Sequence, residues 1–121
     1  MPISTTSKPN GTGVKRIFRA SMNAVSGLKI CWINESAFRQ EMMLCLVLYP
    51  FLFFADVTSV EKALLFSSLT LVVVVELINS AIENTIDRIG LEHNELSGRA
   101  KDMGAAAVML TIFMTVGVWL C

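Results

Sequence analysis

Charged residues and cysteines are scarce in this chain. Only 17% of its 121 residues are charged and 54% are hydrophobic, whereas ordinary soluble domains have about 25% charged and about 45–50% apolar residues. A chain this apolar is not disordered, and three cysteines are too few for a disulfide scaffold. Ten basic residues balance ten acidic ones, so bulk electrostatics do not favour a nucleic-acid partner, and none is predicted. The length allows one domain at most.

Charge is absent altogether from three long segments. They cover residues 42–55, 63–75 and 103–121, and the second continues beyond Glu76. The last would form a helix of about 28 Å, close to the ~30 Å hydrocarbon core of a bilayer. The first is short enough to be a buried helix of a soluble protein, but its two longer neighbours favour a further membrane span, kinked at Pro50.

We therefore predict an all-α membrane protein with three transmembrane helices, at about 40–58, 62–82 and 101–120. Its orientation follows from lysine and arginine, which collect in the cytoplasmic loops. Residues 1–40 hold six of them and the second loop, 83–102, holds three, whereas the first loop holds one. This asymmetry predicts a multi-pass protein with its N-terminus and second loop in the cytoplasm and its C-terminus on the periplasmic side.

The N-terminal region divides into two parts. Residues 1–13 are small and polar, with Pro and Gly, so a disordered segment without a signal peptide is expected. From Val14 onward apolar residues recur every three or four positions, with basic residues largely between them. This pattern predicts an amphipathic helix in the membrane interface, with Trp32 at the aromatic level, and a soluble helix packed on other helices is the alternative. Residues 14–121 are expected to form a single domain.

One acidic residue, Glu76, interrupts the second apolar segment. A charge at the centre of a span costs about 2.5–3.5 kcal/mol, and the Leu, Ile, Val and Phe residues of 63–78 return roughly 5 kcal/mol. The helix therefore still inserts, and the acid is expected to be functional. Helical spacing places it on one polar ridge, which descends to the cytoplasmic surface and consists of Glu76, Asn79, Ser80, Glu83 and Asp87.

The polar ridge suits a hard cation and a proton acceptor, because Mg²⁺ takes one or two carboxylates together with phosphate oxygens. Arg99 and Lys101 add positive charge at its cytoplasmic end. Three structural alternatives stay open. In the first, Glu76 pairs with a lysine or binds a neighbouring helix. In the second, Glu83 and Asp87 form a solvated helix end, and in the third, Arg99 and Lys101 serve only to set the topology.

A polar segment, 90–104, separates the second and third predicted spans. Ser97 and Gly98 predict a turn there, with a new helix running on from Arg99, and His93 is expected to be an exposed loop residue. Signatures of soluble kinases are absent from the sequence, which has no G-x-x-x-x-G-K-S/T, HRD or DFG string. The string GRAKDMG at 98–104 is not a phosphate loop of either type.

Three strings resemble the small prokaryotic diacylglycerol kinases, and the likeness covers about residues 14–118. They are WINESAFRQE at 32–41, ELINSAIE at 76–83 followed by Asp87 and Arg88, and ELSGRAKDMGAA at 95–106. The resemblance implies an interfacial helix plus three transmembrane helices, assembled as a homotrimer in the inner membrane. It also implies transfer of the γ-phosphate of ATP to the primary hydroxyl of diacylglycerol, which gives phosphatidic acid.

The resemblance implies roles for individual residues as well. Glu76 matches the catalytic base and Asn79 a position that supports the site, while Glu35 and Glu83 match the ligands of Mg²⁺. The positions that match contacts of ATP are Arg16, Asn23, Glu35, Glu83, Glu92, His93, Asn94, Lys101 and Asp102. The positions that match contacts of the lipid substrate are Arg16, Ala20, Lys29, Trp32, Ala37, Arg39, Gln40, Glu41, Glu76 and Ala105.

Other functions remain as alternatives. A related branch of the same family phosphorylates undecaprenol, although the tryptophan-led string is closer to the diacylglycerol branch. A non-enzymatic proton or ion conduit would use Glu76 and Glu83, because intramembrane acids often line such paths. A structural membrane subunit would need neither residue. Because the candidate residues come from different helices, an oligomeric site is expected for the enzyme.

Overall fold

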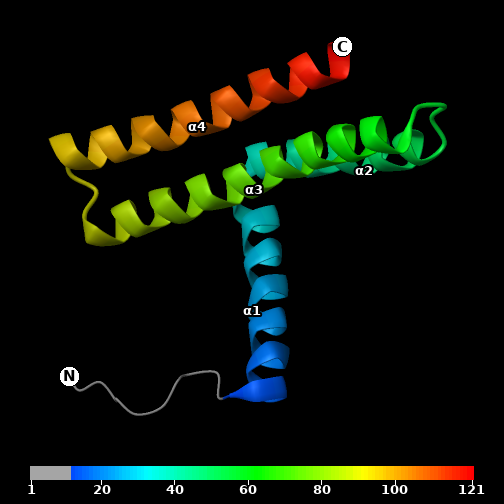
Figure 1. Cartoon of the computed structure of the whole chain (residues 1–121). Coiled ribbons are helices and arrows are strands. Elements are labelled where there is room, and N and C mark those ends of the chain that lie inside the picture. The colour runs from blue at the N-terminus through cyan, green and yellow to red at the C-terminus, as the bar shows by residue number, and fades with distance from the viewer. Residues whose placement is uncertain (1–11) are drawn as a thin grey trace.

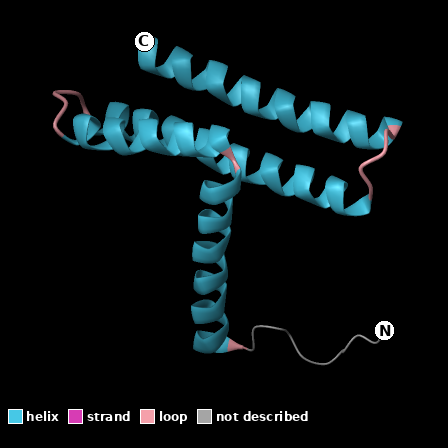
Figure 2. Cartoon of the chain, turned by 180° about the vertical axis from the view of Figure 1, so that it is seen from behind, coloured by secondary structure: helices cyan, strands magenta, loops and turns pink. Residues whose placement is uncertain are grey.

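The computed structural model describes residues 12–121, which form four α-helices and no strand. The helices are α1 (Gly13–Asn34), α2 (Ser36–Phe53), α3 (Ser59–Ile89) and α4 (Glu95–Leu120). Helix α3 packs against both α2 and α4, whereas most of α1 projects away from these three helices (Figure 1). Short loops join the four helices (Figure 2). The predicted all-α fold is confirmed. Residues 1–11 of the segment expected to be disordered, 1–13, lie outside the described residues, and Gly13 is already the first residue of α1.

Local hydrogen bonds explain where α3 begins and ends. Its first turn has a capping box, in which the Thr58 hydroxyl accepts from the Glu61 N–H at 3.1 Å and the Thr58 N–H donates to Glu61 Oε1 at 2.8 Å. Its last turn closes at Gly90, whose N–H donates to the Ile86 carbonyl at 3.1 Å. The helix therefore begins three residues before the predicted residue 62 and extends beyond residue 82.

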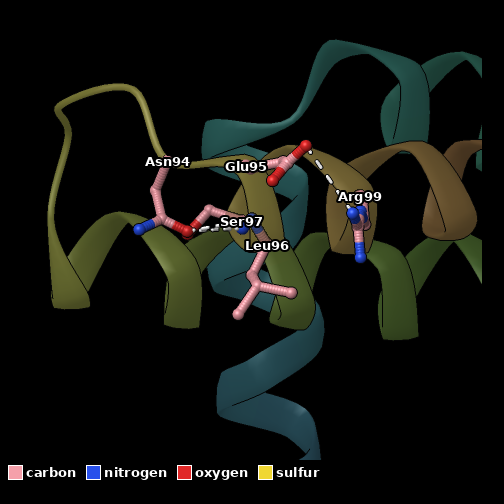
Figure 3. A network of polar contacts seen from close by, with 5 residues as sticks. All are labelled: Asn94, Glu95, Leu96, Ser97 and Arg99. Atoms are coloured by element: carbon pink, nitrogen blue, oxygen red, sulfur yellow. Dashed lines mark hydrogen bonds and ion pairs between the residues drawn. The ribbon is translucent and has the colours of Figure 1, made fainter.

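The start of α4 corrects the predicted turn at Ser97 and Gly98. Asn94 caps the helix, and its Oδ1 accepts from the N–H groups of Leu96 at 2.9 Å and Ser97 at 3.1 Å (Figure 3). An amide cap of this kind satisfies donors that a helix start leaves unpaired. The helix consequently begins at Glu95 and includes both residues of the predicted turn.

Helix α2 also differs from the span predicted at 40–58. It begins earlier, at Ser36, and ends at Phe53, one turn after Pro50. Beyond it the chain turns, with the Phe54 N–H donating to the Pro50 carbonyl at 3.3 Å and the Ala55 N–H donating to that of Leu52 at 3.2 Å. Proline lacks an N–H and disfavours continuation of a helix, which accounts for the early end.

Two of the described helices, α3 and α4, are long and apolar enough to cross a membrane. With 31 and 26 residues, they are about 46 and 39 Å long, longer than the ~30 Å hydrocarbon core. Both therefore extend beyond it, and the polar ends that face each other are the C-terminal turns of α3 and the N-terminal turns of α4 (Figure 1). Large apolar side chains such as Leu64, Phe66, Leu110 and Phe113 are exposed, as expected for surfaces that face acyl chains.

The packed core lies where α1, α2 and α3 meet. Phe38 is only 1% exposed and packs with Cys31, Cys45, Leu69 and Val73. This cluster fixes the corner between α1 and α2 against the middle of α3.

Hydrogen bonds between helices add to this packing. The Thr115 hydroxyl of α4 donates to the Ser68 carbonyl of α3 at 3.0 Å, and the hydroxyls of Tyr49 and Thr70 join α2 to α3 at 2.7 Å. Interhelical hydrogen bonds of this type stabilise helix pairs in membranes by about 0.6 kcal/mol on average. The three packed helices are thus joined by both apolar and polar contacts.

Helix α1 contributes little to the packed helices. Within α1, Cys31 is the buried residue, and the apolar side chains of Val14, Ile17, Phe18 and Met22 are exposed. The predicted helix is confirmed. Within the described chain, only the last turns of α1 contact α2 and α3, and the apolar side chains of its earlier turns contact no other helix.

The core predicts a large effect of truncation at Phe38. We expect Phe38→Ala to lower the free energy of unfolding by about 3–5 kcal/mol, because it removes a fully buried ring. Denaturant unfolding of the purified chain in detergent micelles measures this change. The matched control on the same helix is Phe51→Ala, which removes a 69% exposed ring and should change the free energy by less than about 1 kcal/mol. Equal losses in the two variants would contradict this packing.

Candidate active site

The polar ridge of α3 is buried over its first three residues. Glu76 is 6%, Asn79 8% and Ser80 4% exposed. Toward the C-terminal end of α3, Glu83 is half-buried and Asp87 is exposed. The helical spacing predicted this common face correctly. Within residues 12–121, no lysine or arginine lies within ion-pair distance of Glu76, so its pairing with a lysine is excluded there.

Other carboxyl groups surround Glu76 instead. Glu41 of α2 lies within hydrogen-bonding reach of it, and Glu35 and Glu83 are close enough to act on it electrostatically. Two carboxyl groups within hydrogen-bonding reach of each other can share a single proton. The four acids come from α2, α3 and the α1–α2 junction, so the fold brings together residues that are far apart in the sequence.

Arg39 holds the junction that positions two of these acids. Its Nη1 donates to the carbonyl oxygens of Trp32 at 2.7 Å and Ile33 at 3.0 Å. These carbonyls belong to the last turn of α1, where the helix leaves them without partners. Glu35 follows in extended conformation, as the single residue between α1 and α2. The arginine therefore ties α2 to the end of α1 and fixes Glu35 and Glu41 on neighbouring turns.

A cavity of about 510 Å³ lies between α1 and α3 beside this acidic cluster. Its walls are mostly apolar, with Leu28, Ile30 and Leu77 among them, and Glu35 and Ser80 supply polar groups. Apolar walls with a few polar groups suit a ligand that is itself amphipathic. Glu76 does not line the cavity, but it precedes Leu77 and lies one helical turn from Ser80.

A second, smaller cavity of about 250 Å³ lies at the cytoplasmic end predicted for α3 and α4. It is far more polar and is lined by Glu92, His93, Asn94 and Lys101, together with Asp87. Lys101 Nζ lies 3.0 Å from Asp87 Oδ1, and both side chains are nearly half exposed. An exposed pair of this kind is worth about 0–1 kcal/mol, so Lys101 is available to an anionic ligand. His93 is in an exposed loop, as predicted.

The two predicted ligands of Mg²⁺ lie near Glu76: Glu83 is two helical turns further along α3, and Glu35 lies at the α1–α2 junction. In residues 12–121, no three Cys, His, Asp or Glu side chains are arranged to hold a metal ion. A pair of carboxylates fits Mg²⁺ that keeps waters and binds together with phosphate oxygens. The donor set therefore suits a cation that arrives with a phosphate compound.

Several predicted contact residues are not brought to either cavity. Arg16, Ala20 and Asn23 are exposed on the part of α1 that projects from the other helices (Figure 1). The others are exposed and line neither cavity: Lys29, Trp32, Ala37, Gln40, Asp102 and Ala105. Their roles stay predictions.

Sequence reasoning missed two features of this site. The first is the contact of Glu41 with Glu76, which joins two helices and leaves no periodic signal. The second is the burial of Cys31, whose thiol lies within hydrogen-bonding reach of Ser80. It depends on the contact of α1 with α3, which the spacing of α1 does not encode. Burial raises the pKa of the Cys31 thiol, which disfavours the thiolate, the nucleophilic form.

Comparison with known proteins identifies the family of this chain. The model of the prokaryotic diacylglycerol kinase family matches residues 22–121. The diacylglycerol kinase of Escherichia coli K12 is 49% identical over 110 residues, which cover 91% of this chain and 90% of that protein. That of Haemophilus influenzae is 44% identical over 108 residues, covering 89% and 92%, and that of Pseudomonas aeruginosa is 43% identical over 108 residues, covering 89% and 88%. On these matches, and with the buried acidic ridge in place, the chain belongs to the prokaryotic diacylglycerol kinase family.

Proposed function

We propose that this protein transfers the γ-phosphate of ATP to diacylglycerol within a membrane. In this reaction the primary hydroxyl oxygen of the lipid forms a bond to the γ-phosphorus, and the bond from that phosphorus to the β–γ bridging oxygen breaks. ADP leaves, the hydroxyl proton passes to a base, and phosphatidic acid remains. Family membership and the names of the relatives support this substrate pair.

The observation that carries the proposal is the burial of Glu76 without a cation beside it. Phosphoryl transfer depends mainly on positioning and charge neutralisation, and it requires an acceptor for the alcohol proton. A carboxylate in the apolar part of α3 would be able to take the proton of an alcohol that reaches the site from a bilayer. Glu76 is therefore assigned as the base, with Glu41 within hydrogen-bonding reach and Asn79 one turn away.

The apolar cavity between α1 and α3 is the proposed place of the lipid. Its aliphatic walls would take the glycerol backbone and the first carbons of the acyl chains, and Ser80 and Glu35 would face the polar part. The cavity opens beside the acidic cluster, so a bound diacylglycerol would present its hydroxyl near Glu76.

The nucleotide is assigned to the polar cavity at the other end of the ridge. Lys101 would exchange its exposed partner Asp87 for the phosphates, and Glu92, His93 and Asn94 would contact the rest of the molecule. Glu35 and Glu83 would hold Mg²⁺, which neutralises phosphate charge when it is bound. Since Glu83 lies about 10 Å along the helix from Glu76, one helix connects the proposed metal ligands with the proposed base.

The assembly is part of the proposal. Arg16 and Asn23 belong to α1, which projects from the other helices, and neither lines the polar cavity of the same chain (Figure 1). Sites shared between subunits of a homotrimer would bring such residues into place. We further propose that α2 is the third transmembrane helix, that α1 lies in the interface, and that the protein is in the inner membrane. The lysine and arginine distribution favours a cytoplasmic N-terminus and a periplasmic C-terminus.

Substrate choice is tested with the purified full-length chain in mixed micelles that contain MgATP and either diacylglycerol or undecaprenol. We expect phosphorylated product with diacylglycerol and far less with undecaprenol. Preference for undecaprenol would overturn the lipid assignment. Proton flux in liposomes without ATP turnover would favour the conduit instead.

Glu76→Gln tests the base. We expect it to lower kcat by about 10²–10⁴-fold, because it removes the proton acceptor, while the unfolding midpoint stays near that of the wild type. The matched control on the same helix is Glu61→Gln, since glutamine also completes a capping box. A Glu76→Gln protein with full turnover would refute the base assignment.

Glu83→Gln tests the magnesium ligand. We expect the Mg²⁺ concentration that gives half-maximal activity to rise about tenfold, because a neutral amide replaces a carboxylate ligand. Titration of the initial rate with Mg²⁺ at fixed ATP measures this. Glu95→Gln is the control, as Glu95 is exposed and lines neither cavity. An unchanged Mg²⁺ dependence in Glu83→Gln would contradict the assignment.

A further inference from the structure

Helix α4 approaches the polar ridge most closely at Gly104. This glycine is buried, and the side chain it faces is that of Asn79 on α3. A Cβ built at Gly104 would overlap Asn79 Oδ1 and would lie 3.1 Å from Asn79 Cγ. The amide of Asn79 therefore occupies the space that any larger residue at 104 would fill.

The surroundings of Asn79 show that its position is imposed by packing. It is buried, and within residues 12–121 its Oδ1 has no hydrogen-bond partner. A buried acceptor without a donor is unfavourable unless a ligand or water satisfies it. No hydrogen bond within the described residues therefore holds the Asn79 Oδ1 in place, and the backbone of α4 at Gly104 limits where this oxygen can lie.

Two other glycines of α4 provide a contrast. A Cβ added at Gly98 or Gly117 meets no atom within 4 Å. Since alanine is a better helix former than glycine, neither of these positions needs glycine for packing within the chain. Gly104 differs from both, because its lack of a side chain leaves room for one particular functional group.

We propose that Gly104 is a positioning residue for phosphoryl transfer, which acts by leaving space for the Asn79 amide one turn from Glu76. This inference rests on the proposed function, and it adds a residue of α4 to the surroundings of Glu76, which otherwise come from α2, α3 and the α1–α2 junction, whereas Lys101 of α4 lies in the polar cavity. Alanine at 104 would push the amide away from its place along the ridge. Displacements of about 1 Å near reacting groups reduce turnover by up to about 100-fold.

The test compares Gly104→Ala with Gly117→Ala in the full-length chain in micelles. Three quantities are measured for each: kcat and KM for MgATP with diacylglycerol, the thermal unfolding midpoint, and the ¹⁵N–¹H resonances of the Asn79 side-chain amide. We expect Gly104→Ala to lower kcat at least about tenfold with little change in KM for ATP, and to shift the Asn79 amide resonances. Gly117→Ala should leave all three near the wild type.

Asn79→Ala and the double variant Asn79→Ala/Gly104→Ala complete a double-mutant cycle. If Gly104→Ala folds poorly, the unfolding midpoints of these variants still show whether the loss of stability comes from the Asn79 side chain. With alanine at 79 the nearest side-chain atom is Cβ, which lies 3.9 Å from the added methyl group, an ordinary contact. The double variant should therefore unfold at the same midpoint as Asn79→Ala alone. Additive losses of stability would overturn the proposal.

The activity and resonance measurements also test the proposal. It would be overturned if Gly104→Ala had the wild-type kcat, or if the Asn79 amide resonances in Gly104→Ala did not shift. A loss of kcat together with a lower unfolding midpoint that Asn79→Ala does not relieve would assign Gly104 to helix packing and overturn the proposal too. If the wild type transfers no phosphate, the proposed function fails and the positioning role fails with it, while the amide resonances still decide whether Gly104 makes room for Asn79.

Discussion

The burial of one carboxyl group inside an apolar pair of helices is the constraint on which the rest of this structure depends. Glu76 lies in a stretch of Val and Leu that favours insertion into a bilayer, and a charge there costs about 2.5–3.5 kcal/mol. The fold places polar groups near it: Glu41 from α2 lies within hydrogen-bonding reach, and Asn79 and Ser80 are buried one turn further along α3. The packed helices thus form a small polar interior within a protein whose outer surface is largely apolar.

The two ends of the ridge meet different surroundings. Toward the membrane it borders an apolar cavity, and toward the predicted cytoplasmic side it reaches a polar cavity that contains Lys101. This division matches the two substrates of the family, since a lipid alcohol comes from the bilayer and a nucleotide from water. The length of α3, which exceeds the thickness of the hydrocarbon core, allows one helix to join both regions.

Much of the fold could be predicted from the sequence, because helical periodicity and missing charge are local properties. The helices and the shared face of Glu76, Asn79 and Ser80 follow from a 3.6-residue repeat. The limits of the helices were less predictable: Pro50 ends α2 early, and the cap at Asn94 starts α4 ahead of Ser97 and Gly98. Contacts between helices, such as Glu41 with Glu76 and Gly104 with Asn79, depend on how the helices cross, and no local pattern encodes them.

The central claim is that Glu76 accepts the proton of a lipid alcohol. It is tested most directly by an experimental structure of the chain with diacylglycerol and a non-hydrolysable ATP analogue bound. The account predicts the primary hydroxyl of the lipid within about 2.6–3.2 Å of a Glu76 carboxyl oxygen, the reach required of a general base. A carboxyl group that points toward acyl chains, with the hydroxyl and the γ-phosphate held elsewhere, would contradict it.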